Sequence, residues 1–169
     1  MAETKTLHKW FWVWDFEKEE RWLNEMANEG WALCSVGYCR YTFERCEAGE
    51  YIIRLEMHDK NDTSYLSFIE EMDGEYIGNI LQWIFIRRKA SLGAFDLYSD
   101  IDSKISHLSK ICNTLRPLML ANIAIGIANA IAPHRLGILN LLAAALLAYG
   151  YGRISEKKEN LSRERLLRE

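Results

Sequence analysis

The sequence predicts an α+β domain, with an antiparallel sheet built from two βαββ units of a ferredoxin-like kind, followed by a C-terminal transmembrane helical hairpin. Three observations lead to this prediction. A pattern of apolar alternation, helix caps and turns occurs twice in residues 1–92. Two apolar runs flank Pro133, His134 and Arg135, and charge is divided unevenly between the two parts of the chain.

The first unit is predicted to begin with a strand over residues 10–14, because this aromatic segment is apolar on both faces. Asp15 is a suitable N-cap for a helix from about Glu17 to Glu29, and Gly30 is a suitable C-terminal cap. Two further strands are expected over residues 31–36 and 38–45, separated by a turn or bulge at Gly37.

The second unit repeats this order of elements. We expect a strand over residues 51–57, a helix over 63–73, and two strands over 75–80 and 81–88. Asp15 and Asp59 are 44 residues apart, as are Gly30 and Gly74. The identity between the halves is low, so a duplication and a chance similarity both stay open.

The two C-terminal apolar runs predict helices that cross a membrane. Ile111 to Ala132 is 22 residues long, which is about 33 Å of helix against a hydrocarbon core of about 30 Å. Leu136 to Tyr151 is shorter, and its extension to Ile154 includes Arg153, whose long side chain reaches the headgroups. The alternative is a soluble helical hairpin buried in an oligomer, which three Asn residues in the runs keep open.

Small and amide side chains recur in both runs at spacings that place them on one helix face. Small residues let membrane helices approach closely, and amides facing lipid are costly, so we expect both kinds between the two helices. These packing candidates are Ala121, Asn122, Ala128, Asn129, Asn140, Ala144 and Ala148.

Charge predicts the orientation in the membrane. Basic residues lie on both outer sides of the hairpin and Arg135 alone lies in its connection, so the positive-inside rule places both termini in the cytoplasm. Residues 1–110 hold 13 basic and 20 acidic residues, a charge of −7. An acidic domain argues against nucleic acid as a partner.

The predicted domain organisation has four parts. They are a cytoplasmic α+β domain over 1–92, a linker and amphipathic helix over 93–110, the two-helix membrane hairpin over 111–154, and a charged cytoplasmic tail over 155–169.

The strands predict an apolar sheet face that the two helices leave uncovered. Exposed apolar patches of this size mark interaction sites. The candidate ligand or partner face consists of Trp10, Trp12, Trp14, Trp31 and Trp83. Its cover is a second copy of the chain, the chain's own membrane-proximal helix, a lipid surface or a flat hydrophobic molecule.

The sequence offers no positive sign of catalysis. The four histidines are scattered over different elements, and none has a Ser, Cys or carboxylate at the spacing of a triad or a metal site. Cys34 and Cys39 form no CxxC pair and are expected to be reduced, buried thiols. We therefore expect no enzyme, no metal and no cofactor.

Several segments resemble a bacterial family whose members carry a domain of unknown function, commonly have a pair of C-terminal membrane helices, and are often encoded beside PadR-type repressors. The resemblance covers nearly the whole chain, and its most specific part is the pattern Trp-Leu-x-x-Met followed by Gly-Trp. The similar segments are residues 11–26, 29–31, 41–43 and 97–100. The resemblance implies a membrane-anchored accessory or sensing role at the bacterial cytoplasmic membrane, for example in envelope or drug stress, and no catalytic residues. In the second half Glu75 stands in the place of Trp31.

Two functions follow as hypotheses. The first is a membrane-anchored, non-enzymatic binding or regulatory module that senses a hydrophobic molecule or envelope stress, or recruits a cytoplasmic partner. The second is a structural subunit of a larger membrane complex, because the hairpin carries small-residue and Asn surfaces. Homo-oligomerisation or binding to another membrane protein is expected in either case.

Overall fold

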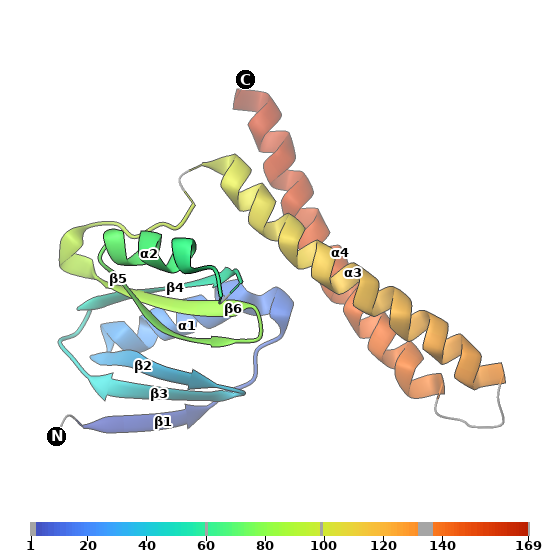
Figure 1. Cartoon of the computed structure of the whole chain (residues 1–169), viewed down its shortest axis with the longest axis horizontal. Helices are drawn as coiled ribbons and strands as arrows, with labels where there is room; N and C mark the ends of the chain where they lie inside the picture. Colours follow the sequence, from blue (N-terminus) through green and yellow to red (C-terminus); the bar gives the residue numbers. More distant parts are fainter. Residues whose placement is uncertain (1–2, 60, 99, 132–136, 169) are drawn as a thin grey trace. The chain divides into compact units, whose positions relative to one another are not determined.

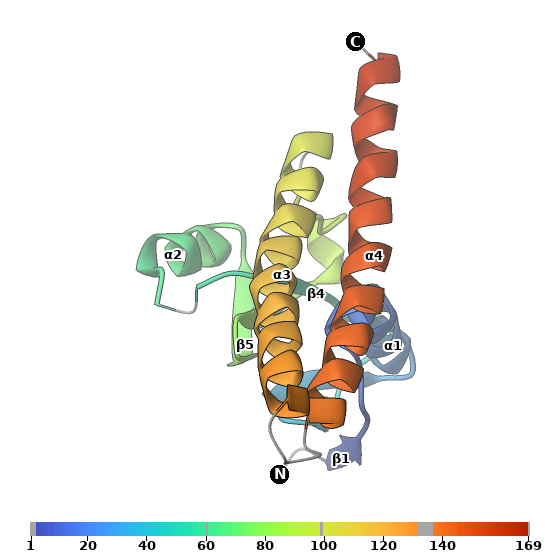
Figure 2. The same ribbon diagram turned by 90° about the vertical axis from the view of Figure 1, so that its right-hand side faces the viewer.

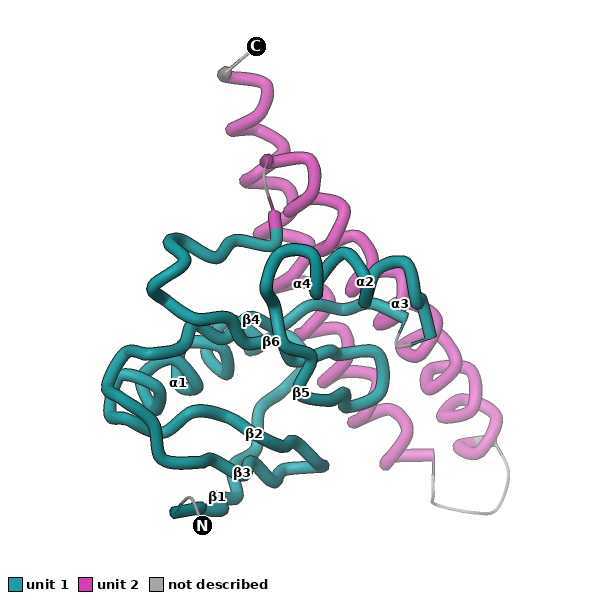
Figure 3. Tube along the Cα trace, turned by 60° about the vertical axis from the view of Figure 1, so that its left-hand side comes forward, with its two compact units in different colours: residues 1–97 teal, residues 98–169 magenta. Residues whose placement is uncertain are grey.

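The computed structural model describes residues 3–59, 61–98, 100–131 and 137–168, and the chain divides into two compact units, unit 1 (1–97) and unit 2 (98–169) (Figure 1, Figure 3). Pro133, His134 and Arg135 lie outside the described residues. Unit 1 contains β1 (Thr4–His8), η1 (Val13–Asp15), α1 (Phe16–Asn28), β2 (Trp31–Gly37), β3 (Arg40–Arg45), β4 (Tyr51–Met57), α2 (Thr63–Glu71), β5 (Gly74–Ile80), β6 (Trp83–Lys89) and η2 (Ala90–Leu92). Unit 2 contains α3 (Ile101–Ile131) and α4 (Gly137–Arg168).

The two predicted βαββ units are confirmed, and each forms its own three-stranded antiparallel sheet. The strand orders are β1-β3-β2 and β4-β6-β5, so the first, third and second strands of each unit lie side by side in the same order. The two halves of unit 1 therefore share one topology.

The strand register supports the repeat residue by residue. Equivalent residue pairs in the two strand ladders are 43 positions apart, since Trp31 pairs with Arg45 and Gly74 pairs with Arg88. Both ladders also shift register at equivalent points, between Leu33 and Ser35 in one and between Tyr76 and Gly78 in the other. The predicted spacing of 44 is therefore wrong by one residue.

This correction changes which residues are equivalent. Gly30 corresponds to Asp73, and both have positive φ, at 84° and 58°, where each helix ends. Gly74, and not Glu75, takes the place of Trp31. A Cβ atom on Gly74 would lie 2.7 Å from Ile69 Cγ2 and 2.9 Å from the Ile69 carbonyl oxygen, so the second βαββ half has no room for a side chain at this position.

The prediction of a strand over residues 10–14 is wrong. The strand that pairs with β3 is the polar segment Thr4–His8, and residues 9–12 form an extended connection into η1. Aromatic content indicated a strand, but Trp12 accepts a backbone hydrogen bond from Asp15 N at 2.8 Å, which turns the chain toward α1. A polar edge strand such as β1 has little apolar signal by which to recognise it.

Helix α1 belongs to the first βαββ half of unit 1 but covers the free edge of the second sheet. Asn24 donates from Nδ2 to the Ile53 carbonyl oxygen and accepts from Ile53 N at Oδ1, both at 2.9 Å. Glu20 Oε2 accepts from Leu55 N at 3.0 Å. Two side chains of α1 thus satisfy the outward backbone groups of β4, which pairs with β6 on its other side.

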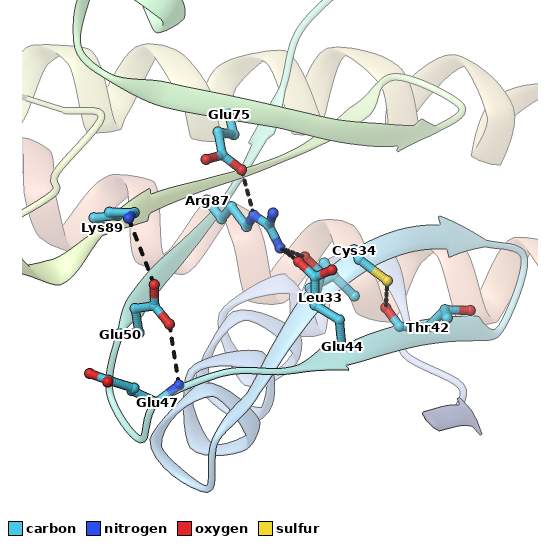
Figure 4. Close-up of polar contacts among 9 residues, drawn as sticks. All are labelled: Leu33, Cys34, Thr42, Glu44, Glu47, Glu50, Glu75, Arg87 and Lys89. Carbon is cyan, nitrogen blue, oxygen red and sulfur yellow. Dashed lines mark hydrogen bonds and ion pairs between the residues drawn. The ribbon is translucent and has the colours of Figure 1, made fainter. Parts of the chain in front are cut away.

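Arg87 of β6 joins the two sheets (Figure 4). Its Nη1 donates to Glu44 Oε1 at 2.6 Å and to the Leu33 carbonyl oxygen at 3.0 Å, and its Nε donates to Glu75 Oε2 at 2.7 Å. Burial disfavours the charged guanidinium, but these bonds to carboxylates outweigh that cost and raise the pKa of Arg87. The polar link is therefore ionised at neutral pH.

Unit 2 is an antiparallel pair of long helices (Figure 2). With 31 and 32 residues, α3 and α4 are about 46 and 48 Å long. Both are long and apolar enough to cross a membrane, and within the most apolar 18 residues of each helix only 22% are buried. Helix α3 continues through Pro117. Neither predicted boundary, 110/111 or 154/155, coincides with a helix end, because the flanking segments continue α3 and α4.

The two helices approach each other closely at Gly126 and Gly137, which the sequence analysis did not single out. A Cβ atom on Gly137 would lie 2.5 Å from the Gly126 carbonyl oxygen and 2.8 Å from Ala130 N. Of the predicted packing residues, Ala144 is buried, and Asn122, Asn129 and Asn140 are half-buried. The prediction is wrong for Ala121, Ala128 and Ala148, which are exposed on the outside of the pair.

Replacing Asn24 by Ala is expected to destabilise unit 1 by about 2–4 kcal/mol, because the N–H and C=O groups of Ile53 would lose their partner. The measurement is urea unfolding of the full chain in mild detergent, followed by tryptophan fluorescence. Glu25→Ala, at the exposed neighbouring position of α1, is the matched control. Equal midpoints for the two variants would contradict the role assigned to Asn24.

Replacing Gly137 by Ala is expected to separate α3 from α4, because the added methyl group meets backbone atoms of α3. Thermal unfolding in mild detergent, followed by helical circular dichroism, should show a lower midpoint. Gly152→Ala is the control, since a Cβ there meets nothing within 4 Å and Ala favours helix by up to about 1 kcal/mol. A midpoint for Gly137→Ala at or above that of Gly152→Ala would refute the close crossing.

Candidate functional site

The segment between β1 and α1 holds three tryptophans in a continuous stack, which we call the Trp ladder (Trp10, Trp12 and Trp14). Trp10 meets Trp12 edge to face at 5.2 Å between ring centroids, and Trp12 stacks on Trp14 at 5.0 Å with an interplanar angle of 3°. An extended backbone at Trp12, with φ −81° and ψ 151°, places alternate side chains on the same side. The shared side was predicted, although the strand was not found.

The ladder is fixed at one end and open at the other. Trp14 is 4% exposed, whereas Trp12 is 40% and Trp10 is 61% exposed. Burial of Trp14 removes a large apolar surface from water and so anchors the stack. Trp10 and Trp12 are left with aromatic surface in contact with solvent, which suits a flat apolar or cationic group.

Side chains on the opposite side of this segment attach it to the first sheet. Phe11 packs against Trp22 of α1 at 5.6 Å and against Tyr41 of β3 at 6.3 Å. Lys9 Nζ lies 4.5 Å from the Trp22 ring centroid, in a cation–π contact. The connection is therefore held by aromatic packing rather than by strand pairing.

The half-buried carboxylate of Glu19 supports this packing through Tyr41. The Tyr41 hydroxyl donates to Glu19 Oε1 at 2.6 Å. Burial raises the pKa of Glu19 above its usual range, and the hydrogen bond from Tyr41 opposes that rise in part. Burial and the nearby Glu19 carboxylate raise the pKa of Tyr41, so its hydroxyl stays protonated and serves as the donor.

The other two predicted face residues do not join the ladder. Trp31 lies at the start of β2, the end opposite to the β2–β3 turn, where Lys5 and Arg45 each lie 5.0 Å from its ring centroid. Trp83 is 8% exposed and packs against Phe16 at 5.1 Å. The structure therefore brings together three of the five tryptophans.

The predicted uncovered apolar sheet face is not found among residues 3–59 and 61–97 of unit 1. In β6, Trp83, Ile84, Phe85 and Ile86 are all buried, so the chain itself covers both faces of the second sheet. Ile84 and Ile86 form a core with Ile69 and Phe95. The outer face of the first sheet is polar, because Thr4, Thr6 and His8 of β1 pair with Glu44, Thr42 and Arg40 of β3.

A second polar cluster connects β4 to α2. The Tyr65 hydroxyl donates to the buried carboxylate of Glu56, and His58 stacks on Tyr65 at 3.8 Å between centroids. His58 Nε2 lies 3.0 Å from Asp62 Oδ2. Asp62 also accepts from Tyr65 N at 3.1 Å and so caps α2. These contacts hold the start of α2.

No metal centre is found within the part of the chain that the structure describes, since no three His, Cys, Asp or Glu side chains are grouped to hold an ion. An open depression of about 330 Å³ lies at the end of α2, lined by Glu70, Asp73, Gly74, Glu75, Lys89 and Leu92. Its mixed charges indicate no particular ligand.

Sequence reasoning missed two exposed apolar side chains. Tyr38 and Leu81 are 73% and 67% exposed, at the turns of the β2–β3 and β5–β6 hairpins. An apolar residue in a two-residue turn is the signal by which both were recognisable, because such turns usually hold Gly, Asn or Asp.

Residues 15–120 match a family model described as "Protein of unknown function (DUF2812)". The chain belongs to this family. The matched region begins at the last residue of η1 and continues past unit 1 into α3, so DUF2812 includes the junction with the first apolar helix. Trp10, Trp12 and Trp14 precede the match. No curated protein and no solved structure matches the chain. The family membership predicted from the resemblance is confirmed, and the PadR neighbourhood stays an expectation.

Replacing Glu19 by Gln is expected to stabilise unit 1 at pH 7 and to have little effect at pH 4. The folded-state pKa of Glu19 is raised, so its favourable contribution is present below the unfolded pKa and is lost as pH rises through the folded pKa. Gln keeps an oxygen for the Tyr41 hydroxyl and carries no charge. Urea unfolding of both proteins at each pH measures the difference, and a difference that does not change with pH would disprove this explanation.

Proposed function

We propose that this DUF2812 protein is a membrane-anchored, non-enzymatic binding module at the cytoplasmic face of the bacterial membrane. In this proposal the Trp ladder binds a flat hydrophobic molecule or an apolar segment of a partner protein. The observation that carries it is the open stack of Trp10 and Trp12 on the buried Trp14. A rigid aromatic stack offers contact area at low cost in conformational entropy.

The anchor is supported by the surface of unit 2. Large aliphatic side chains point outward from both helices, among them Leu118, Leu120, Ile125, Ile127, Ile138, Leu139 and Leu142, each at least half exposed. In water this surface is unfavourable, whereas in a bilayer it faces acyl chains, and the helices satisfy most of their backbone groups by their own hydrogen bonds.

Binding at the ladder is expected to fail when its open half is removed. In lipid nanodiscs, the full chain should raise the fluorescence anisotropy of rhodamine 6G, a flat aromatic cation, above the value for empty discs. The double variant Trp10→Ala/Trp12→Ala should lose this increment. Phe68→Ala, which removes another exposed aromatic side chain in α2, is the control and should retain it. An equal increment in all three proteins would refute the ladder as a binding surface.

The orientation is tested in cells. The full chain should remain in the membrane pellet after a carbonate wash. A His134→Cys variant with its native cysteines replaced should react with an impermeant maleimide from outside, because the positive-inside rule places both termini in the cytoplasm. Release of the protein by the wash would remove the anchor from the proposal, and labelling only after lysis would reverse the orientation.

A structural role in a larger membrane complex is the second candidate. Ala121, Ala124 and Ala128 form a small-residue stripe on the outer surface of α3, a surface that lets a further membrane helix approach closely. A single size corresponding to the monomer in mild detergent, with no co-purifying protein, would exclude this candidate.

A further inference from the structure

The two hairpin turns of unit 1 present apolar side chains at equivalent positions. Tyr38 and Leu81 are each the first residue of a two-residue turn, and they are 43 residues apart, the spacing that relates the two strand ladders. Equivalent backbone hydrogen bonds hold each turn, from Lys9 N to the Cys39 carbonyl oxygen at 3.1 Å and from His58 N to the Gln82 carbonyl oxygen at 2.8 Å.

Both turns lie at the same end of unit 1, which we call the tip end. Strands β2 and β5 run side by side in the same direction, because a Cβ atom on Gly78 would lie 3.2 Å from Val36 and Arg87 binds both Leu33 and Glu75. Figure 4 shows the two hairpins extending in the same direction beyond these contacts. The Lys9–Cys39 bond places the start of the Trp ladder beside the first turn.

The second turn keeps its leucine in a backbone conformation that favours glycine. Leu81 has φ of 54°, in the left-handed region, where any residue with a Cβ atom is strained. The side chain is also 67% exposed and so recovers little from packing. Neither the backbone nor the core of unit 1 accounts for leucine at this position.

Charge distinguishes the tip end from the opposite end of the strands. His8, Lys9 and Arg40 are exposed beside the first turn, where His8 pairs with Arg40 across the β1–β3 ladder. At the second turn the acidic residues Asp59 and Asp62 follow β4, where His58 N donates to the Gln82 carbonyl oxygen. A larger group of carboxylates lies at the opposite end, where β2 and β5 begin and where β3 is followed by β4. These are Glu29, Glu44, Glu47, Glu50, Glu70, Glu71, Asp73 and Glu75. Figure 4 shows four of them, together with Arg87.

We propose that the tip end docks on the lipid headgroups, with Tyr38 and Leu81 inserted at the boundary between headgroups and acyl chains. Single apolar side chains on projecting turns, next to basic residues, suit an anionic bilayer surface, where Tyr and Trp partition and Lys and Arg meet phosphates. The acidic opposite end then points away from the bilayer. This inference rests on the membrane anchor of the proposed function and is independent of any ligand at the ladder.

The connection between the units favours a bilayer over a separate protein partner. Leu97 packs against the core of unit 1, and α3 begins at Ile101, so three residues connect a folded domain to the anchoring helices. A short tether gives the bilayer surface a high effective concentration around unit 1. Weak insertion of two side chains is then sufficient for docking.

The native Cys39, the neighbour of Tyr38 in the turn, reports on this contact. The full chain, with Cys34, Cys46 and Cys112 replaced by Ala, is spin-labelled at Cys39 and reconstituted in vesicles of phosphatidylethanolamine and phosphatidylglycerol. Dissolved oxygen, which concentrates in the bilayer, should raise the relaxation rate of this spin label more than a water-soluble nickel chelate does. A matched protein labelled at Cys46, which follows β3 at the opposite end, should show the reverse.

The variant Leu81→Gly makes the test specific. Glycine relieves the left-handed backbone, so unit 1 should be as stable as the parent protein or more stable. The Cys39 label should nevertheless shift toward the nickel chelate, most of all when Tyr38→Ser is added. If the Cys39 label of the protein without Leu81→Gly is exposed to water, while the protein is still retained after a carbonate wash, docking is refuted and the anchor stands. Spin–spin broadening that disappears on dilution with unlabelled protein would assign the tips to a second copy. Loss of the protein in the wash would refute anchor and docking together.

Discussion

Unit 1 depends on the contact between α1 and the free edge of β4. Without Asn24 and Glu20, the outward backbone groups of Ile53 and Leu55 would face water or another chain. The two sheets would then be joined by Arg87 and by the contact between β2 and β5. The contact has a cost, because burial raises the pKa of Glu20 and so disfavours its ionised form, which the Leu55 N–H and then Arg54 partly restore. Helix α1 therefore packs against its own sheet and also covers the free edge of the other sheet.

The repeat is clearest in the backbone arrangement of the strands. Strand order, ladder register, the register shift and the positions of the two-residue turns are equivalent in the two halves. The turns differ in backbone conformation, because positive φ falls on Cys39 in the first and on Leu81 in the second. The helices also differ in length, and Gly74 replaces the bulky Trp31. The difference at this position is explained by Ile69, which fills the space next to Gly74. Divergence of this kind leaves the aromatic stack on one half alone, since the connection between β4 and α2 carries His58 and Asp62 instead.

The helices and most strands were predictable from the sequence because each has a local cause, although Asp15, the expected N-cap of α1, makes no side-chain capping hydrogen bond. Asp62, Gly30 and the alternation in β4 are examples. The errors arise where long-range packing decides. Trp10 to Trp14 have the composition of a strand, but Phe11 packs on Trp22 and Tyr41, and the polar β1 takes the place beside β3. Likewise the alanines of α3 and α4 resemble a packing surface, while the observed crossing uses Gly126 and Gly137, which only the geometry of the helix pair identifies.

Helix α4 ends by returning to the start of α3, where Arg165 Nη1 lies 2.7 Å from Asp102 Oδ1. The two residues are 63 positions apart in sequence. During synthesis, unit 1 has left the ribosome and can fold before α4 exists, because domains generally fold from the N-terminus onward. Leu108, Ile111 and Leu115 of α3 are buried in the finished pair, so they stay without their full packing until the last turns of α4 emerge. The interval between these two events is the period in which α3 is most open to chaperones, to the insertion machinery and to aggregation.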